Sequence, residues 1–143
     1  MKQREIKFRA WSEQSGCMYS SENQNDQQGE IHTLDQFFQA LQIRKDLKNY
    51  EFKLMQFTSL LDKNGKEIYE GDVLKVEWRT ASTGKYFQSD DAYCEHESIV
   101  SVGYKNISFG FFLNDGKMFS LRKDASIEVI GNIYENPELI INP

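Results

Sequence analysis

The strongest constraint on this sequence is a repeated alternation of side chains, interrupted by short turn signals. Ile107, Phe109, Phe111 and Leu113 recur at every second position, and the turn sequence Asn114-Asp115-Gly116 follows them. A period of two is typical of a half-buried β-strand. Asp-Gly favours the tight turn of a β-hairpin. A chain with this pattern has to pair short strands into a sheet.

The same pattern recurs along most of the chain. The predicted strands cover residues 4–11, 17–19, 51–58, 73–78, 99–104, 118–121 and 127–133. Asn64-Gly65 is the strongest short turn signal, and Glu70-Gly71-Asp72 marks a second tight corner. We therefore predict an α+β, mostly β fold, either a small bent sheet or an SH3-like barrel. Residues 79–97 have no clean period and are predicted to be a loop, with a strand extension near Tyr86 and Phe87 as the alternative.

Helix is predicted at two places. Residues 33–46 carry apolar side chains at helical spacing, with Thr33 as N-cap and Gln36 completing a capping box. Asn136-Pro137 predicts a short helical turn near the C-terminus, since Asn caps well and Pro suits a first helical turn.

Length and composition favour one domain over residues 1–143. The aromatic fraction of 13% is enough to build a core in a chain of this length. Cys17 and Cys94 are too few for a disulfide scaffold. No apolar stretch follows the opening charges, and no apolar run is long enough to span a bilayer. We expect free thiols, no membrane association and a cytoplasmic protein.

Three blocks of sequence are more specific than their composition. They are IKFRAW with CMYS (6–11 and 17–20), LMQFTSLLDKNGKEIYEGDVLKV (54–76) and IEVIGNIYENPEL (127–139). Together they resemble the YopX family of small phage and prophage proteins, and the middle block is the most specific. The resemblance implies a single YopX-like domain encoded by a phage or prophage, acting in a bacterial host cell. It implies no catalytic residues.

The chain departs from the family pattern in its first and middle blocks, and one departure is Leu61, at a position that is usually polar in the family. Ser12 follows Trp11 where the family usually has an acidic residue, and Ser59 follows Thr58 where the family usually has Gly. A Ser at position 59 suggests that this position does not strictly need a positive φ.

No group of residues predicts chemistry. The carboxylates of the middle block lack the spacing of an EF-hand and fit turns instead. The predicted turn architecture consists of Asn64, Gly65, Glu70, Gly71 and Asp72. Cys94, Glu95 and His96 form the only cluster with soft ligands, but no CxxC spacing accompanies them. We predict no catalytic residue, no metal site and no cofactor. Convergence of Glu70, Asp72 and His96 on one cavity would favour an enzyme instead.

Two candidate surfaces suggest two kinds of partner. The aromatic candidates for a protein interface are Trp11, Tyr19, Trp78, Tyr86, Phe87 and Tyr93, and the basic candidates are Lys2, Arg4, Lys7 and Arg9. We favour a non-catalytic protein-interaction module that binds an unknown host or phage protein through a sheet edge or through the loops at 20–30 and 79–97. The alternative is a weak nucleic-acid-binding small barrel, which the net charge of −5 disfavours. A homo-oligomer would cover open sheet edges.

Overall fold

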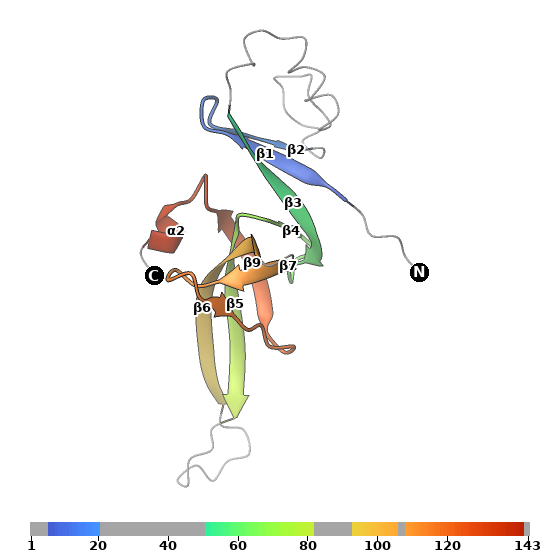
Figure 1. Cartoon of the computed structure of the whole chain (residues 1–143). Helices are drawn as coiled ribbons and strands as arrows, with labels where there is room; N and C mark the ends of the chain where they lie inside the picture. Colours follow the sequence, from blue (N-terminus) through green and yellow to red (C-terminus); the bar gives the residue numbers. More distant parts are fainter. Residues whose placement is uncertain (1–5, 21–50, 82–92, 106–107, 142–143) are drawn as a thin grey trace. The chain divides into compact units, whose positions relative to one another are not determined.

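The computed structural model describes residues 6–20, 51–81, 93–105 and 108–141 (Figure 1). In chain order, its strands are β1 (Phe8–Ser12), β2 (Cys17–Ser20), β3 (Phe52–Leu61), β4 (Glu67–Tyr69), β5 (Asp72–Ala81), β6 (Tyr93–Lys105), β7 (Ser108–Phe112), β8 (Met118–Phe119) and β9 (Ser126–Asn132), followed by the helix α2 (Glu138–Ile141). The mostly β prediction is confirmed. The helix predicted over 33–46 lies outside the described residues. No helix of the described part is long and apolar enough to cross a membrane.

The chain divides into two compact units between Ser59 and Leu60. In the first unit, β1 pairs antiparallel with β2 on one side and with β3 on the other. The hairpin expected in the first twenty residues is therefore confirmed. Ala10, Met55 and Phe57 are buried in this unit. A single domain over 1–143 stays a prediction.

In the second unit, the end of β3 leads through a turn to β4, and five antiparallel strands follow in the order β8-β7-β6-β5-β9. Alternate side chains of these strands form the core. Its buried members are Ile68, Leu74, Val76, Val100 and Val102, and Phe111, Phe119, Ile127 and Val129 pack against them. The alternation that predicted a core face at Phe111 is thus confirmed.

The described strands form two open sheets and not a closed barrel. In the second unit, the sheet ends at β8 on one side and at β9 on the other, and the described residues contain no pairing between these two strands. The bent-sheet alternative describes these sheets, and the described residues do not show the closure of an SH3-like barrel. Tight turns and strand periods specify hairpins, but they do not specify whether two distant edges meet.

Two carboxylates organise the turns around β4. Asp62 Oδ1 accepts the N–H groups of Asn64 and Lys66 at 2.8 and 2.9 Å, while Gly65 has a φ of 79°. The carboxylate of Asp72 is buried and accepts the N–H of Tyr69 at 2.8 Å. These carboxylates satisfy backbone donors that a tight turn would otherwise leave unpaired.

Ser59 corrects an interpretation of the sequence. Its φ is 69°, in the left-handed region that favours glycine. Met55 and Phe57 are buried at alternate positions, but Thr58 is buried as well and Ser59 is exposed. The alternation of β3 therefore slips at this residue, and the inference that position 59 does not need a positive φ is wrong.

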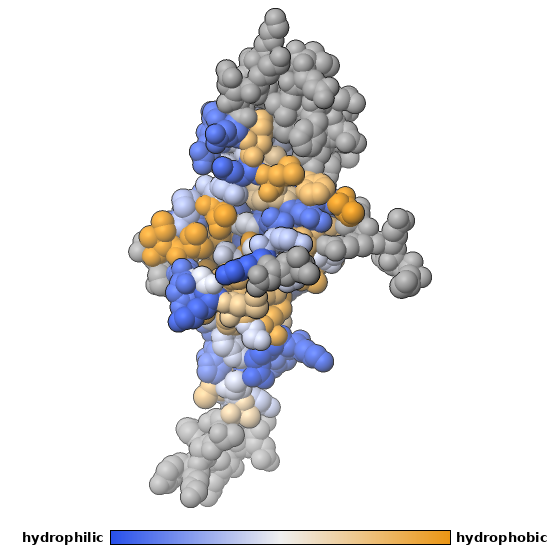
Figure 2. All heavy atoms as spheres, viewed as in Figure 1, coloured by the Kyte–Doolittle hydropathy of each residue, from blue (hydrophilic) through white to orange (hydrophobic). Residues whose placement is uncertain are grey.

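The C-terminal helical turn is confirmed as α2. The segment before it returns to β9, where Asn136 Oδ1 accepts the N–H of Asn132 at 3.3 Å. A Cβ added at Gly131 would lie 2.5 Å from this Oδ1 and 2.9 Å from Leu139 Cδ1, so this approach requires a glycine. Ile141 is 70% exposed, and Figure 2 shows the apolar surface over α2.

Candidate functional site

At one end of the second unit, β5 and β6 extend beyond β9, the strand that pairs with β5 on its other side. β6 pairs with β5 as far as Ala81, opposite Tyr93, whereas β9 pairs with β5 only as far as Glu77, opposite Ser126. Residues 78–81 and 93–96 therefore continue beyond β9 as a two-stranded ribbon (Figure 1), here called the β5–β6 ribbon.

This ribbon corrects the loop predicted over 79–97. Its described residues, 79–81 and 93–97, are paired strand. Residues 93–97 are all exposed, so no apolar alternation marks them in the sequence. Backbone pairing and cross-strand contacts hold such a segment, and neither produces a hydrophobic period. Tyr86 and Phe87 lie outside the described residues.

One face of the ribbon carries stacked rings. The rings of Trp78 and His96 lie 5.3 Å apart at an angle of 16°, and Phe119 lies 5.6 Å from Trp78. Thr80 Oγ1 and His96 Nε2 form a hydrogen bond of 2.8 Å. Trp78 packs against the core while His96 is exposed. The core thus fixes an aromatic platform at the base of the ribbon.

The opposite face carries paired charges. Arg79 and Glu95 form an ion pair of 2.8 Å, and Lys75 contacts Glu77 at 2.9 Å and Glu97 at 3.2 Å. The ammonium of Lys75 donates hydrogen bonds to the carboxylates of Glu77 and Glu97, which raise the pKa of Lys75, and the bond from Lys75 lowers the pKa of Glu77. Such exposed pairs add little to stability. Their effect is to order a charged surface across two strands.

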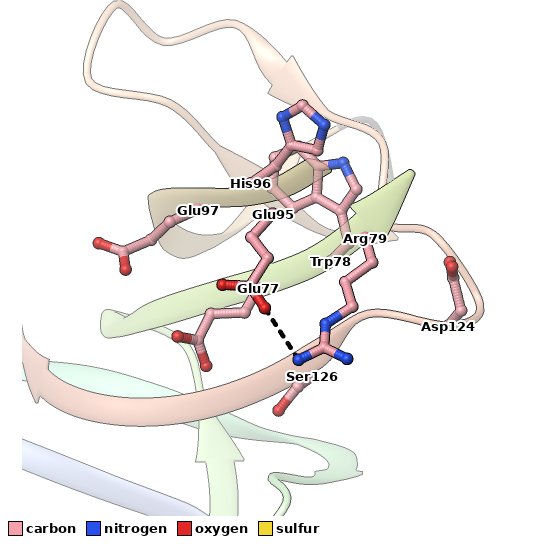
Figure 3. A pocket seen from close by; sticks show the side chains of 8 residues that line it. All are labelled: Glu77, Trp78, Arg79, Glu95, His96, Glu97, Asp124 and Ser126. Atoms are coloured by element: carbon pink, nitrogen blue, oxygen red, sulfur yellow. Dashed lines mark ion pairs between the residues drawn. The ribbon is translucent and has the colours of Figure 1, made fainter. Parts of the chain in front are cut away.

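A cavity of about 840 Å³ lies beside Ser126, where the pairing between β9 and β5 ends. Its lining consists of Glu77, Trp78, Arg79, Glu95, His96, Glu97, Asp124 and Ser126. Figure 3 shows the rings of Trp78 and His96 on one side of the two strands, with the Arg79–Glu95 ion pair on the other.

The lining of the cavity can be compared with the three residues whose convergence the sequence named as the sign of an enzyme. It includes His96 but neither Glu70 nor Asp72, so the convergence that would favour an enzyme is not seen. Among the described residues, no group of three His, Cys, Asp or Glu side chains could hold a metal ion. Cys94 is exposed. Acidic and basic side chains of the cavity pair with one another across the strands, as in the ion pair of Arg79 with Glu95.

The predicted aromatic residues separate between the two units. Trp78 and Tyr93 belong to the β5–β6 ribbon, and Tyr93 is 59% exposed. Trp11 and Tyr19 lie on β1 and β2 of the first unit, where both are half-buried. Tyr19 packs edge-on against Phe52, with 6.1 Å between ring centroids.

The predicted basic surface is described only in part. Lys7 Nζ lies 5.6 Å from the centre of the Phe57 ring, and Arg9 is on β1 in the same unit. Lys2 and Arg4 lie outside the described residues.

Sequence reasoning missed Arg79 and Asp124, and it considered Glu95 only as a neighbour of Cys94 and His96. A usable signal was present. Lys75, Glu77 and Arg79 alternate in charge at every second residue, and Glu95 and Glu97 repeat the same spacing. Two charged rows of this kind predict complementary faces on adjacent strands.

Comparison with known proteins identifies relatives over nearly the whole chain. A family model described as "YopX protein" matches residues 7–141. The crystal structure of protein EF1440 from Enterococcus faecalis is 26% identical with a TM-score of 0.54, covering 96% of this chain and 99% of that chain. No protein of curated function matches.

Proposed function

This chain belongs to the YopX protein family, and from that premise we propose that it is a phage- or prophage-encoded accessory protein that acts as a non-catalytic protein-interaction module. The observation that supports this proposal is the β5–β6 ribbon, which extends beyond β9 with an aromatic face, a charged face and an exposed Tyr93. A large exposed aromatic on an ordered strand is the kind of residue that dominates binding energy at protein interfaces.

The side chains around the ribbon support recognition over catalysis. Arg79, Lys75 and their carboxylate partners neutralise one another. A catalytic site instead needs a nucleophile or base that is oriented toward a substrate position. The charged face also carries the exposed ring of Tyr93, so aromatic, cationic and anionic groups lie within a few residues of one another, a mixture typical of specific polar interfaces.

A photo-cross-linking amino acid placed at Tyr93 of the full-length protein tests this proposal in cells of a Gram-positive bacterium. The matched control carries the same amino acid at Asn64, an exposed turn residue of the same unit. We expect one discrete protein adduct from position 93 that survives nuclease treatment, and no such adduct from position 64. Equal labelling from both positions, or an adduct that nuclease removes, would overturn the proposal.

A further inference from the structure

The hydrogen bonds of β9 show which residues of β5 direct their backbone N–H and C=O groups toward β9. The carbonyl of Ile127 accepts the N–H of Lys63 at 2.9 Å, and the N–H of Val129 donates to Asp62 Oδ2 at 3.0 Å. Both groups of β9 therefore point away from β5. Because successive residues of a strand direct their N–H and C=O to opposite sides, Ser126 and Glu128 point toward β5.

The same alternation continues along β5. Ser126 and Glu128 lie opposite Glu77 and Lys75, so the backbone groups of Lys75 and Glu77 point toward β9. Arg79 lies two residues after Glu77, and Ala81 lies four residues after it. The backbone N–H and C=O groups of both therefore point to the same side of β5, beyond the end of β9. Within the described residues, the N–H and C=O of Arg79 and Ala81 have no strand beside them.

Two other edges of this unit are protected, whereas, within the described residues, the outer edge of β6 is also open over residues 93–99, because β7 pairs with β6 only from Ser101 to Lys105. The outer edge of β9 is capped by the Asp62–Lys63 turn through the two contacts given above. β8, at the other end of the sheet, has only two residues, and very short edge strands resist pairing. An edge left open on a longer, ordered strand is a template for an added strand.

The two faces beside this edge define the side chains that an added strand would carry. A strand in this position would place alternate side chains next to Trp78 and Thr80 on one face and next to Arg79 and Ala81 on the opposite face, which Glu77 shares. The Trp78 face is aromatic. The cavity is lined by Trp78 and His96 of this face and by four carboxylates and one guanidinium; Lys75 and Arg122 pair with three of these carboxylates, and the guanidinium of Arg79 pairs with the fourth.

The net charge of the whole second unit also favours a basic partner segment. Residues 60–143 contain 14 acidic and 9 basic residues, for a net charge of −5, while residues 1–59 contain eight of each. The entire net negative charge of the chain thus lies in the unit that holds the open edge. This field attracts a basic segment and repels an acidic one.

We propose that the open edge of β5 at Arg79 and Ala81 binds an extended, basic segment of a protein partner by strand addition, with apolar side chains on the Trp78 face and basic side chains on the Glu77 face. This proposal rests on the interaction-module function proposed above and adds the chemistry of the partner segment to it.

The probe is a capped hexapeptide, Lys-Val-Lys-Val-Lys-Val, titrated into the ¹⁵N-labelled full-length protein and followed by amide chemical shifts. Ala81→Pro removes the outward N–H without removing a side-chain contact, and Ala81→Thr keeps that N–H. We expect amide shifts concentrated at residues 77–81, unchanged binding by Ala81→Thr, and a loss of about fivefold or more in Ala81→Pro, as expected for one hydrogen bond of ordinary strength.

Two peptides separate strand addition from simple charge attraction. The hexapeptide methylated on every backbone nitrogen keeps the side chains but loses the N–H donors, and it should not bind. The acidic peptide Glu-Val-Glu-Val-Glu-Val keeps the backbone, and it should bind more weakly than the basic one. Equal binding of the methylated peptide would overturn the proposal.

A second pair of variants guards against loss of fold in Ala81→Pro. Arg79→Pro removes the other outward N–H, and Arg79→Ala removes the ion pair with Glu95 while keeping the N–H. Weaker binding in Arg79→Pro than in Arg79→Ala is expected, and equal binding would contradict the proposal. If the wild-type protein binds no peptide at millimolar concentration but Tyr93 still cross-links a protein, strand addition is wrong and the interaction-module proposal stands. Absence of both signals removes both proposals.

Discussion

At the scale of single residues, Asp62 connects two segments that are far apart in the chain. Its side chain accepts N–H groups from Asn64 and Lys66 in its own turn and from Val129 in β9. Burial of this carboxyl raises its pKa, but the backbone hydrogen bonds from Val129, Lys66 and Asn64, with the charge of Lys66, outweigh burial and lower the pKa below its ordinary value of 3.8. The charged form is therefore the one that stabilises the fold.

Replacing Asp62 by Asn tests this role. Asn cannot accept all three N–H groups without turning its own NH₂ toward a donor, so we expect the free energy of unfolding to fall by roughly 2 kcal/mol near pH 7. Since the folded-state pKa is lowered, this contribution is complete above the unfolded pKa and is lost as the pH falls through the folded one. Urea unfolding between pH 7 and pH 3 should show the wild-type advantage shrinking with acid.

Asp115 offers the matched control for Asp62. It accepts the N–H of Lys117 in a similar turn but is exposed, and the structure shows no bond from it to another strand. Asp115→Asn should cost clearly less than Asp62→Asn. Equal costs, or a wild-type advantage that grows toward pH 3, would contradict the role assigned to Asp62.

Ser59 provides a test whose sign is informative. A glycine inside a strand normally destabilises it by about 0.5–1 kcal/mol. At a φ of 69°, however, a side chain carries a cost of roughly 1 kcal/mol that glycine avoids. We expect Ser59→Gly to raise the free energy of unfolding slightly, by up to about 0.5 kcal/mol, and Ser59→Val to lower it, measured by urea denaturation. Destabilisation by Ser59→Gly would show that the left-handed backbone is not maintained in solution.

The turns show what single residues could predict from sequence. Gly65, Gly71 and Gly116 have a φ between 77° and 79°, each at a turn that the sequence indicated. Ser59 could not be predicted in this way, because serine has no preference for a positive φ. The bond from Val129 to Asp62 spans 67 residues, a distance over which no local pattern carries information.

At the scale of elements, the packing of the C-terminal segment on β9 depends on Gly131. Adding a methyl group by Gly131→Ala would drive a Cβ to within 2.5 Å of Asn136 Oδ1, so we expect a loss of roughly 2 kcal/mol in the free energy of unfolding. Asn136→Ala removes the obstructing atom. In a double-mutant cycle measured by urea denaturation, Gly131→Ala should therefore cost less in the Asn136→Ala background. Equal costs in both backgrounds would mean that the contact does not limit the position of the segment.

Elements were predictable where burial imposes a period. β7 and β9 alternate because one face meets the core, and α2 follows the Asn-Pro signal. In the β5–β6 ribbon, charged side chains form ion pairs across the strands and the rings of Trp78 and His96 stack across them. These contacts do not require alternate apolar residues. The strand character of the ribbon is therefore visible only when both strands are compared, and the sequence alone described it as a loop. The same reason hid the candidate site, which depends on where β9 stops.

At the scale of the whole molecule, the distribution of charge separates the two classes of partner. The first unit is formally neutral and the second carries the net charge of −5. Nucleic-acid affinity depends mainly on neutralising phosphates with Lys and Arg, and a net negative field opposes it. The basic residues of β1 and its flank belong to the formally neutral unit, where Lys7 Nζ lies 5.6 Å from the centre of the Phe57 ring.

We therefore expect no saturable binding of a fluorescein-labelled single-stranded DNA to the full-length protein at physiological salt, measured by fluorescence anisotropy. A weak signal at low salt should disappear steeply as salt is added, because only counterion release would drive it. The double variant Lys7→Ala/Arg9→Ala is compared with Lys63→Ala/Lys117→Ala, which removes the same charge from exposed turns of the second unit. Binding that persists at physiological salt and is lost only in the first variant would establish the first strand as a nucleic-acid surface, and it would displace the protein-interaction function proposed for the β5–β6 ribbon.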